Sequence, residues 1–396
     1  MAADEANDFG WKLSDTQRQF VGTVRAVTQG EFRHRGLDYM DGTFPRQNIR
    51  RLAELGILGM AVPEAYGGSE ANVFDTALVL EEIAKGCYVT AMAALGEVGS
   101  QTRIIATYAP ESIKQRLLPA VCTGECILAI CMTEPHAGTD VGNYTTNADI
   151  SGATIRLNGV KTLISRAEDA SALVVFTRIN NEPGSAGIGC VLVEKDSPGF
   201  EVSGKFHSMG GEYLYEVRFD DCELPAENLL LGAGSLKKLL SAFNTQRCLN
   251  PSISLGLAEG AFDESLRYAA DRKAFDQPIG TFQGMRWKLA DMYNQIEAGR
   301  GLLYRACALA DPFPDPLQAA MAKVYCNEMS VRATSDAIQI HGGYGYTDEY
   351  LVSRLFRGAR YGSLGGGTSE TLRDLIGKRL IAKADEPDGI FGISGL

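Results

Sequence analysis

One turn-forming segment carries residue types that can bind an anion or the edge of a ring. Residues 131–140 read Cys-Met-Thr-Glu-Pro-His-Ala-Gly-Thr-Asp, so Thr133, Gly138 and Thr139 fall in the turn after a short apolar run. Successive backbone N–H groups in such a turn form a concave anion site. A capped turn without a ligand would use the same residues, so this segment alone leaves both interpretations open.

Three further segments combine glycines with charged or amide side chains. Residues 63–68 read Pro-Glu-Ala-Tyr-Gly-Gly, Arg272 and Phe275 precede Gln283, and residues 339–346 read Gln-Ile-His-Gly-Gly-Tyr-Gly-Tyr. Glycine supplies 44 of the 396 residues, whereas a usual share is about 7%. Proline supplies only 14. The glycine excess therefore indicates tight backbone rather than flexible linkers.

The elements that must position these segments change along the chain from helix to strand and back. From residue 13 to about 126, apolar residues recur three and four apart, which predicts helices, with Ser14 and Asp15 at the start of the first. From 127 to about 232, β-branched and aromatic runs alternate with Asn-Gly and Pro-Gly turns, which predicts a β-domain. The helical period then returns. We expect an α+β chain with a ligand in a cleft between unlike domains, which span residues 1–126, 127–232 and 233–396.

Composition excludes several classes of function. The 38 basic and 49 acidic side chains give a net charge of −11, which argues against a general nucleic-acid or membrane surface. The nine cysteines lack paired spacing and the four histidines lie far apart in sequence, so no metal site is expected. No stretch reaches the ~18 apolar residues of a membrane span, and the acidic start does not have the features of a leader. We expect a cytoplasmic protein with reduced cysteines.

Taken together and in this order, the four segments resemble those of the acyl-CoA dehydrogenase superfamily, and the resemblance covers essentially the whole chain. It implies an N-terminal helical domain, a middle β-domain and a C-terminal four-helix bundle. It also implies FAD in the cleft, a CoA thioester as the substrate, and a homotetramer built as a dimer of dimers.

The resemblance also implies roles for particular residues. The flavin and its pyrophosphate would be lined by Met132, Thr133, Gly138, Thr139, Leu163 and Ser165. The ADP half, partly in a neighbouring subunit, would be held by Arg272, Phe275, Gln283, Gln339, Gly342, Gly343 and Thr368. The acyl group would lie beside Met92, Leu95, Phe243, Asn244 and Gly367. The chemistry agrees, because an always-charged arginine suits a diphosphate and glycines let a ligand approach the backbone closely.

The chain departs from the family at the catalytic base. Most members use a glutamate to abstract the α-proton while the β-hydrogen leaves as hydride, and a placed base is typically worth ~10²–10⁴-fold. That glutamate usually precedes the Gly-Thr of a C-terminal loop, where this chain has Gly366 before Gly367 and Thr368. In other members it precedes the arginine of the first C-terminal helix, where this chain has Gln246 before Arg247. An amide accepts no proton at neutral pH, so both positions of the base are empty.

Two more departures bear on the reaction. Leu163 stands where the family often has a tryptophan beside the flavin, and a smaller side chain there either leaves room for dioxygen or reflects simple repacking. The segments around Gln246 and Gly366 are similar to those of the 3-sulfinopropionyl-CoA desulfinases. Those enzymes carry an arginine for the sulfinate where this chain has Met92, and an apolar residue cannot neutralise a buried charge.

Three readings stay open. The favoured one is flavin-dependent oxygenation, with dioxygen, of an uncharged, cyclic or aromatic acyl-CoA, such as a tropone-forming reaction. In this reaction Gln246 orients the acyl group, and Arg247 braces the loop that contains Gly365, Gly366 and Gly367 (the glycine loop). The second is α,β-desaturation, either of an activated substrate whose α-proton needs no strong base or with Glu97 or Glu212 as an acidic residue arriving from elsewhere, or a desulfinase-like elimination. The third is a non-catalytic scaffold, against which the joint presence of the cofactor residues argues.

Overall fold

A computed structural model of the protein describes residues 12–382, so the acidic start, residues 1–11, lies outside the described residues. The first helix, α1 (Asp15–Val27), begins as the sequence predicts. The side chain of Ser14 accepts the backbone N–H of Gln17, and the side chain of Gln17 accepts the backbone N–H of Ser14. This capping box satisfies two N–H groups that have no partner within the helix.

Six more α-helices complete the described N-terminal part of the chain, and one of them, α5, is buried by the others and by the rest of the protein. They are α2 (Arg33–Arg35), α3 (Arg46–Glu54), α4 (Val73–Ala84), α5 (Tyr88–Val98), α6 (Ser100–Tyr108) and α7 (Glu111–Thr123). All 11 residues of α5 are buried, as is typical of a helix that lies in the core rather than on the surface. A helix packed on every side holds its side chains, including that of Met92, in fixed positions.

The middle of the chain forms a single sheet of eight strands. These are β1 (Leu128–Cys131), β2 (Asn147–Ser151), β3 (Thr154–Ser165), β4 (Ala172–Ile179), β5 (Ile188–Glu194), β6 (Phe200–His207), β7 (Tyr213–Pro225) and β8 (Leu229–Leu231). Their order is β6-β7-β3-β2-β4-β5-β8, and β1 pairs with β4 in parallel. The pairing of β3 with β7 shifts between Lys161 and Ile164. At this shift Leu163 takes a φ of 57° and leaves 52% of its surface exposed.

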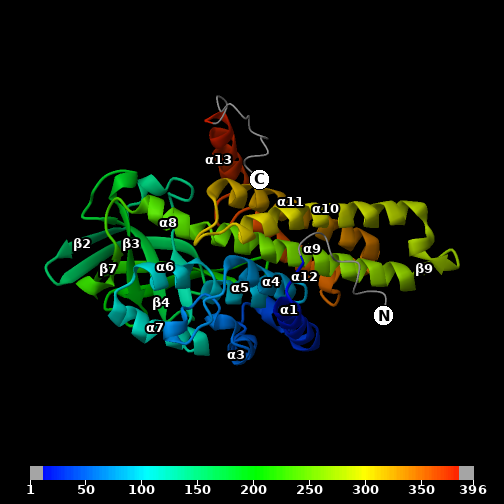
Figure 1. Ribbon diagram of the computed structural model, residues 1–396, viewed down its shortest axis with the longest axis horizontal. Helices are drawn as coiled ribbons and strands as arrows, with labels where there is room; N and C mark the ends of the chain where they lie inside the picture. The colour runs from blue at the N-terminus through cyan, green and yellow to red at the C-terminus, as the bar shows by residue number, and fades with distance from the viewer. Residues whose placement is uncertain (1–11, 383–396) are drawn as a thin grey trace.

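The C-terminal part is helical. It contains α8 (Leu236–Phe243), α9 (Gln246–Asp271), α10 (Gln283–Ala308), α11 (Pro316–His341), α12 (Leu351–Gly362) and α13 (Ser369–Ile381). Helices α9 to α12 pack as a four-helix bundle that runs from the sheet to the far end of the molecule, and α13 projects from its side (Figure 1).

A two-stranded hairpin connects α9 to α10 at the far end of the bundle. Its strands are β9 (Lys273–Ala274) and β10 (Gln277–Pro278). The helical period that returns after residue 232 continues through residues 256–275 of the sequence, which by itself predicts a helix to residue 275, but α9 ends at Asp271. The reason is local, because Phe275 and Asp276 both have positive φ, of 52° and 64°, as a tight two-residue hairpin turn requires.

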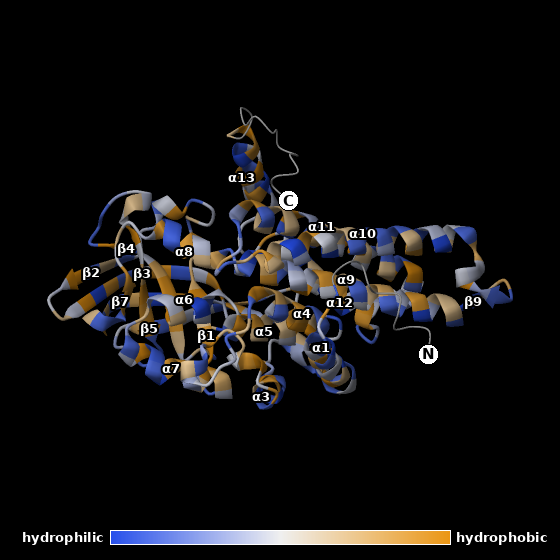
Figure 2. Cartoon of the chain, in the orientation of Figure 1, coloured by the Kyte–Doolittle hydropathy of each residue, from blue (hydrophilic) through white to orange (hydrophobic). Residues whose placement is uncertain are grey.

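Apolar residues are concentrated in the central strands and in α4 and α5 (Figure 2). Within residues 12–382 no helix is long and apolar enough to cross a bilayer. In the same range no three histidine, cysteine, aspartate or glutamate side chains are grouped so that they could hold a metal ion.

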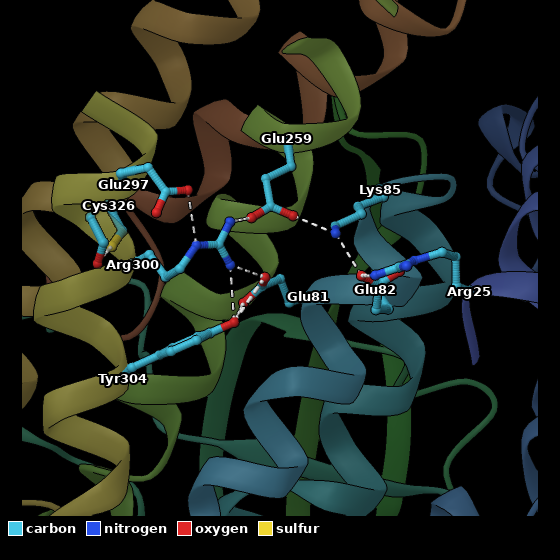
Figure 3. Close-up of polar contacts among 10 residues, drawn as sticks. Arg25, Glu81, Glu82, Lys85, Glu259, Glu297, Arg300, Tyr304 and Cys326 are labelled. Atoms are coloured by element: carbon cyan, nitrogen blue, oxygen red, sulfur yellow. Dashed lines mark hydrogen bonds and ion pairs between the residues drawn. The ribbon is translucent and has the colours of Figure 1, made fainter. Parts of the chain in front are cut away.

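A buried network of charges joins the N-terminal helices to the bundle. Arg300 of α10 lies between Glu81 of α4 and Glu259 of α9, and donates to both (Figure 3). The hydroxyl of Tyr304 donates to Glu81, and Lys85 pairs with Glu259. Although burial disfavours the charged form, Glu81 and Tyr304 raise the pKa of Arg300 above its ordinary value. The network fixes α4, and the chain that continues into α5, against the bundle.

Candidate active site

The two positions of the missing base lie together in space. Gln246 is the first residue of α9, and Gly366 lies in the loop between α12 and α13. A Cβ atom placed on Gly366 would lie 3.5 Å from Cε of Lys323 and 4.0 Å from Cγ of Gln246, with no other non-neighbouring atom within 4 Å. Gly366 has a φ of 75°, which L residues with side chains rarely adopt. Where family members would carry a carboxylate, this chain has an open space beside an amide and an amine.

Gln246 approaches the junction of α5 and α6. Its Oε1 lies 3.5 Å from Oγ of Ser100, and it would lie 3.1 Å from a Cβ on Gly99. The hydroxyl contact is at the long limit of a hydrogen bond, so the amide is only weakly restrained. Gln246 is thus free to offer its oxygen or its NH₂ group to a ligand in the space beside Gly366.

Arg247 lies close to three of the residues expected beside the acyl group. Its Nη1 donates to Oδ1 of Asn244 at 3.0 Å, and its guanidinium lies 6.0 Å from the centre of the Phe243 ring. Its Nη2 would lie 3.7 Å from a Cβ on Gly367. Burial lowers the pKa of Arg247, and its Nε is buried without a hydrogen-bond partner among the described residues. The structure therefore brings Phe243, Asn244, Arg247 and Gly367 together.

Lys323 donates hydrogen bonds to the backbone of the glycine loop and of the helix end before it. It is 1% exposed, and its Nζ donates to the carbonyl oxygens of Gly362 at 2.8 Å and Gly367 at 3.0 Å. Burial and the nearby charge of Arg247 lower the pKa of Lys323 to about 7. A neutral amine has two N–H groups, which matches the two carbonyl acceptors. None of the sequence motifs includes this residue, and its only signal in the sequence is a single lysine within the apolar run Ala-Ala-Met-Ala-Lys-Val.

The turn after β1 lies directly beside the irregular part of β3. The carbonyl oxygen of Thr133 accepts the backbone N–H of Thr162 at 2.8 Å, and that of Met132 accepts from Nζ of Lys161 at 2.9 Å. A Cβ on Gly138 would have no atom within 4 Å, so the outer side of the turn is open. Thr139 is exposed on the same turn. These contacts place the turn residues beside Leu163 and Ser165.

A buried ion pair holds this turn in place. Lys161 donates to Oε1 of Glu134 at 2.8 Å, and both side chains are at most 1% exposed. Burial lowers the pKa of Lys161 to about 8, and Glu134 opposes that change. Burial disfavours the charged form of Glu134, but Lys161 and the backbone N–H groups of Thr145 and Thr146 donate hydrogen bonds to the carboxylate, and together with the charge of Lys161 they lower its pKa. The pair fixes the turn without occupying its outer face.

Met92 and Ser165 line one narrow cavity of about 30 Å³. Arg166 and Glu212 line the same cavity. Leu95 is fully buried nearby on α5 and is not one of the lining residues, although the resemblance implies a place for it beside the acyl group. The cavity lies between α5 and the ends of β3 and β7.

Arg166 joins β3 to α5 through buried contacts. It donates to the carbonyl oxygens of Met92 at 2.6 Å and Ala93 at 2.7 Å, and to Oε2 of Glu97 at 3.3 Å. Glu97 also accepts the backbone N–H of Leu128 at 3.0 Å. Burial raises the pKa of Glu97 to about 7, although Arg166 opposes that change. Glu97 is thus a structural partner of Arg166 and does not line the cavity.

The residues expected at the ADP half of the cofactor lie mostly at the far end of the bundle. Arg272, Gly342 and Gly343 line a groove of about 490 Å³, in which Arg272 also lies 5.9 Å from the centre of the Tyr344 ring. Phe275 is 89% exposed on the hairpin. Gln283 and Gln339 are exposed on α10 and α11.

This groove is remote from the turn, the cavity and the glycine loop. The 26 residues of α9, which separate Gln246 from Arg272, span about 39 Å. Thr368 belongs to the glycine-loop end instead, where its side chain accepts the backbone N–H of Thr371 and caps α13. One chain therefore presents two separate groups of the expected cofactor residues, at opposite ends of the bundle (Figure 1).

Comparison with known proteins matches this arrangement over nearly all of the described residues. Residues 14–125, 129–222 and 236–381 match the models of the N-terminal, middle and C-terminal domains of acyl-CoA dehydrogenases. The chain belongs to the acyl-CoA dehydrogenase family. The expected α+β fold, with its N-terminal helical, middle β and C-terminal helical domains, is thereby confirmed.

Individual relatives within the acyl-CoA dehydrogenase family differ in their reactions. The chain is 38% identical to benzylmalonyl-CoA dehydrogenase of Aromatoleum aromaticum, over 85% of this chain and 90% of that protein. It is 34% identical to 3-sulfinopropanoyl-CoA desulfinase of Cupriavidus necator, over 96% and 99%. The structure of butyryl-CoA dehydrogenase from Megasphaera elsdenii superimposes with a TM-score of 0.89 at 31% identity, over 94% and 99%.

Acyl-CoA dehydrogenases are FAD-dependent oxidoreductases that act on acyl-CoA, and this chain is a flavoenzyme of that family. The described residues fit the cofactor. The exposed side chain of Leu163 offers an apolar surface for a ring system. The open turn at Gly138 and the groove at Gly342 and Gly343, where a Cβ would meet no atom within 4 Å, leave room for phosphates, and Arg272 supplies a positive charge there.

Proposed function

We propose that this flavoenzyme oxidises an uncharged, cyclic or aromatic acyl-CoA without a carboxylate base and uses dioxygen as the electron acceptor and oxygen source, as a tropone-forming enzyme would. One observation carries the proposal. Gln246 and Gly366, the two positions where family members keep the base, converge on one open space that contains an amide and no carboxylate. A substrate that reacts there needs an α-proton acidic enough to leave without a strong base.

The chain's own side chains orient the substrate and hold the loop. Gln246 faces the acyl group with an amide that can donate or accept a hydrogen bond. Lys323 donates to the carbonyl oxygen of Gly367, which restrains the backbone of the loop, and the guanidinium of Arg247 lies beside the same glycine. Bound FAD would supply the electron-accepting chemistry of the reaction.

Leu163 supports the use of dioxygen. The shift in the pairing of β3 with β7 makes Leu163 project from the sheet beside Ser165, with 52% of its side chain exposed. A leucine is smaller than the tryptophan that many family members carry there. The space that remains beside the ring system would admit a molecule as small as dioxygen.

The distribution of the cofactor residues supports an oligomer. Since the groove at Arg272 and the turn at Thr133 lie at opposite ends of the bundle, a second copy would have to supply the groove for a cofactor bound at the turn. The long exposed side chains of the hairpin and of α13 are compatible with that contact. We propose a homotetramer, a dimer of dimers, with each FAD between two subunits.

The test is a reaction of the reduced holoenzyme. Enzyme reduced in the absence of air is mixed with air-saturated buffer, with and without cyclic, aromatic and straight-chain CoA thioesters, while the flavin absorbance and the products are followed. Thioester-dependent reoxidation with oxygen from labelled dioxygen in the product supports the proposal. Flavin that stays reduced, with no oxygenated product, refutes it.

Desaturation is the second candidate, because benzylmalonyl-CoA dehydrogenase is among the most similar relatives and Glu212 lies in the cavity. Anaerobic bleaching of the flavin by saturated acyl-CoAs would favour it. A desulfinase-like elimination is disfavoured, because Met92 lines the cavity and the donors of Arg166 are directed at backbone carbonyls and Glu97. Sulfite release from a sulfinated acyl-CoA would overturn that view.

A further inference from the structure

Glu212 places a carboxylate in the wall of the cavity that Met92 and Ser165 line. It follows a tight turn at the start of β7, where Gly211 has a φ of 109°. The imidazole of His207 is within 3.1 Å of the carbonyl oxygens of both Met40 and Gly211, which ties this turn to the N-terminal domain. The position of the carboxylate is therefore set by backbone contacts on both sides.

Tyr88 orients Glu212 from behind. Its hydroxyl donates to Oε1 of Glu212 at 2.9 Å, and the tyrosine is 5% exposed. Its ring is held between two glycines, because a Cβ on Gly210 would lie 2.6 Å from the ring and a Cβ on Gly358 would lie 2.5 Å from it. One carboxylate oxygen therefore accepts a hydrogen bond from a tyrosine that is closely packed on two sides.

The other oxygen of Glu212 has no such partner. Oε2 is buried and has no hydrogen-bond partner among residues 12–382. Arg166, which lines the same cavity, does not fill this role, since it donates to Met92, Ala93 and Glu97. A buried acceptor without a donor is unfavourable, and a ligand that brings an O–H group removes that penalty.

Glu212 is also close to the glycine loop. The ring of Tyr361 occupies the place of a side chain at position 365, because a Cβ on Gly365 would lie 2.3 Å from the tyrosine hydroxyl. Burial and the charge of Glu212 raise the pKa of Tyr361 to about 12. Through Tyr88, whose ring packs against Gly358, the carboxylate is joined to α12, the helix that precedes the loop containing Gly366.

We propose that Glu212 is a specificity-determining residue that accepts a hydrogen bond from a hydroxyl group on the acyl moiety, so that the substrate class is a hydroxylated or enolic acyl-CoA. This inference rests on the proposed function, because it takes the cavity at Met92 and Ser165 as the place where the far end of the acyl group lies. The volume of about 30 Å³ has room for a hydroxyl group and not for a ring, so the ring would lie outside the cavity and one neutral hydroxyl would enter it.

The test measures binding without turnover. FAD-loaded enzyme is titrated in the absence of air with phenylacetyl-CoA and its 2-, 3- and 4-hydroxy derivatives, and with cyclohexylacetyl-CoA and its hydroxy derivatives, while the flavin spectrum reports the dissociation constant. One hydroxylated isomer is expected to bind about 10- to 100-fold more tightly than its parent. Equal binding of all hydroxylated and parent thioesters refutes the inference alone. Failure of every thioester to bind refutes the proposed function and the inference together.

Glu212→Gln is the decisive variant. Its amide keeps one acceptor oxygen for Tyr88 and replaces the other with an NH₂ group that cannot accept and can only form a neutral hydrogen bond to the oxygen of a hydroxyl group. A neutral hydrogen bond is roughly half as strong as one to a carboxylate, so the preference for the hydroxylated isomer should fall to about 3- to 10-fold, whereas Glu168→Gln, in the outer groove beside this cavity, should retain the full preference. An undiminished preference in Glu212→Gln overturns the assignment. Bound FAD and an unchanged melting temperature show that the variant is folded.

Discussion

The carboxyl group of Glu97 should make the stability of this protein depend on pH between about 4.5 and 7. Burial raises the pKa of Glu97 from 4.5 to about 7, and its two oxygens meet the backbone N–H of Leu128 and the guanidinium of Arg166. In this window the folded chain holds a proton that the unfolded chain has released. The free energy of unfolding therefore falls as pH rises through the window and levels off above it.

The size of the effect follows from the two pKa values. From 4.5 to about 7 is roughly 2.5 pH units, which at 1.36 kcal/mol per unit corresponds to about 3 kcal/mol. Glu97→Gln keeps the shape of the side chain but cannot titrate, so the wild type should lose about 3 kcal/mol relative to the variant between pH 4.5 and 7.5. The side chain is completely buried, so solvent does not screen this effect.

The assay is urea unfolding of the FAD-saturated protein at several pH values and one protein concentration. The exposed Glu125→Gln is the matched control and should follow the wild type at every pH. A constant difference between wild type and Glu97→Gln across the range would refute the reasoning. Glu97→Gln should also retain flavin reduction by thioester substrates, because Glu97 acts through Arg166 and does not line the cavity.

Three further changes test the buried network, the missing base and the space beside the flavin. Arg300→Met leaves Glu81 and Glu259 without the buried arginine that they share, and it should lower the free energy of unfolding by about 3–5 kcal/mol. Thermal unfolding measures this loss, and the double variant Arg300→Met with Glu81→Leu should recover part of the lost stability. Gly366→Glu should introduce desaturation of a saturated acyl-CoA, at a rate ~10²–10⁴-fold above that of Gly366→Gln. The glutamine variant is the control because it shares the strained φ of 75°, and anaerobic bleaching of the flavin measures both rates. Equal rates of the two would mean that the acyl group lies elsewhere. Leu163→Trp should slow the reoxidation of reduced flavin by air, measured in a stopped-flow experiment, without weakening thioester binding; unchanged reoxidation would show that the space at Leu163 is not used by dioxygen.

Local signals in the sequence were sufficient for the fold. The capping box at Ser14, the helical period of the N-terminal and C-terminal parts and the alternating runs of β3, β4, β5 and β7 are short-range patterns, and each forms the element it predicts. The exception is instructive, since the end of α9 depends on a hairpin turn at Phe275 and Asp276 that the helical period cannot reveal.

The sequence by itself also determined that both positions of the family's base lack a carboxylate, because an amino-acid type can be read directly at each motif. Only the tertiary structure decided what surrounds those positions. Lys323, Glu212 and Arg166 come from α11, the start of β7 and the end of β3, and they approach the site from elements far apart in the chain. The physical reason is that burial, pKa values and unpaired oxygens are properties of packed neighbours, and neighbours are set by tertiary contacts rather than by spacing along the chain.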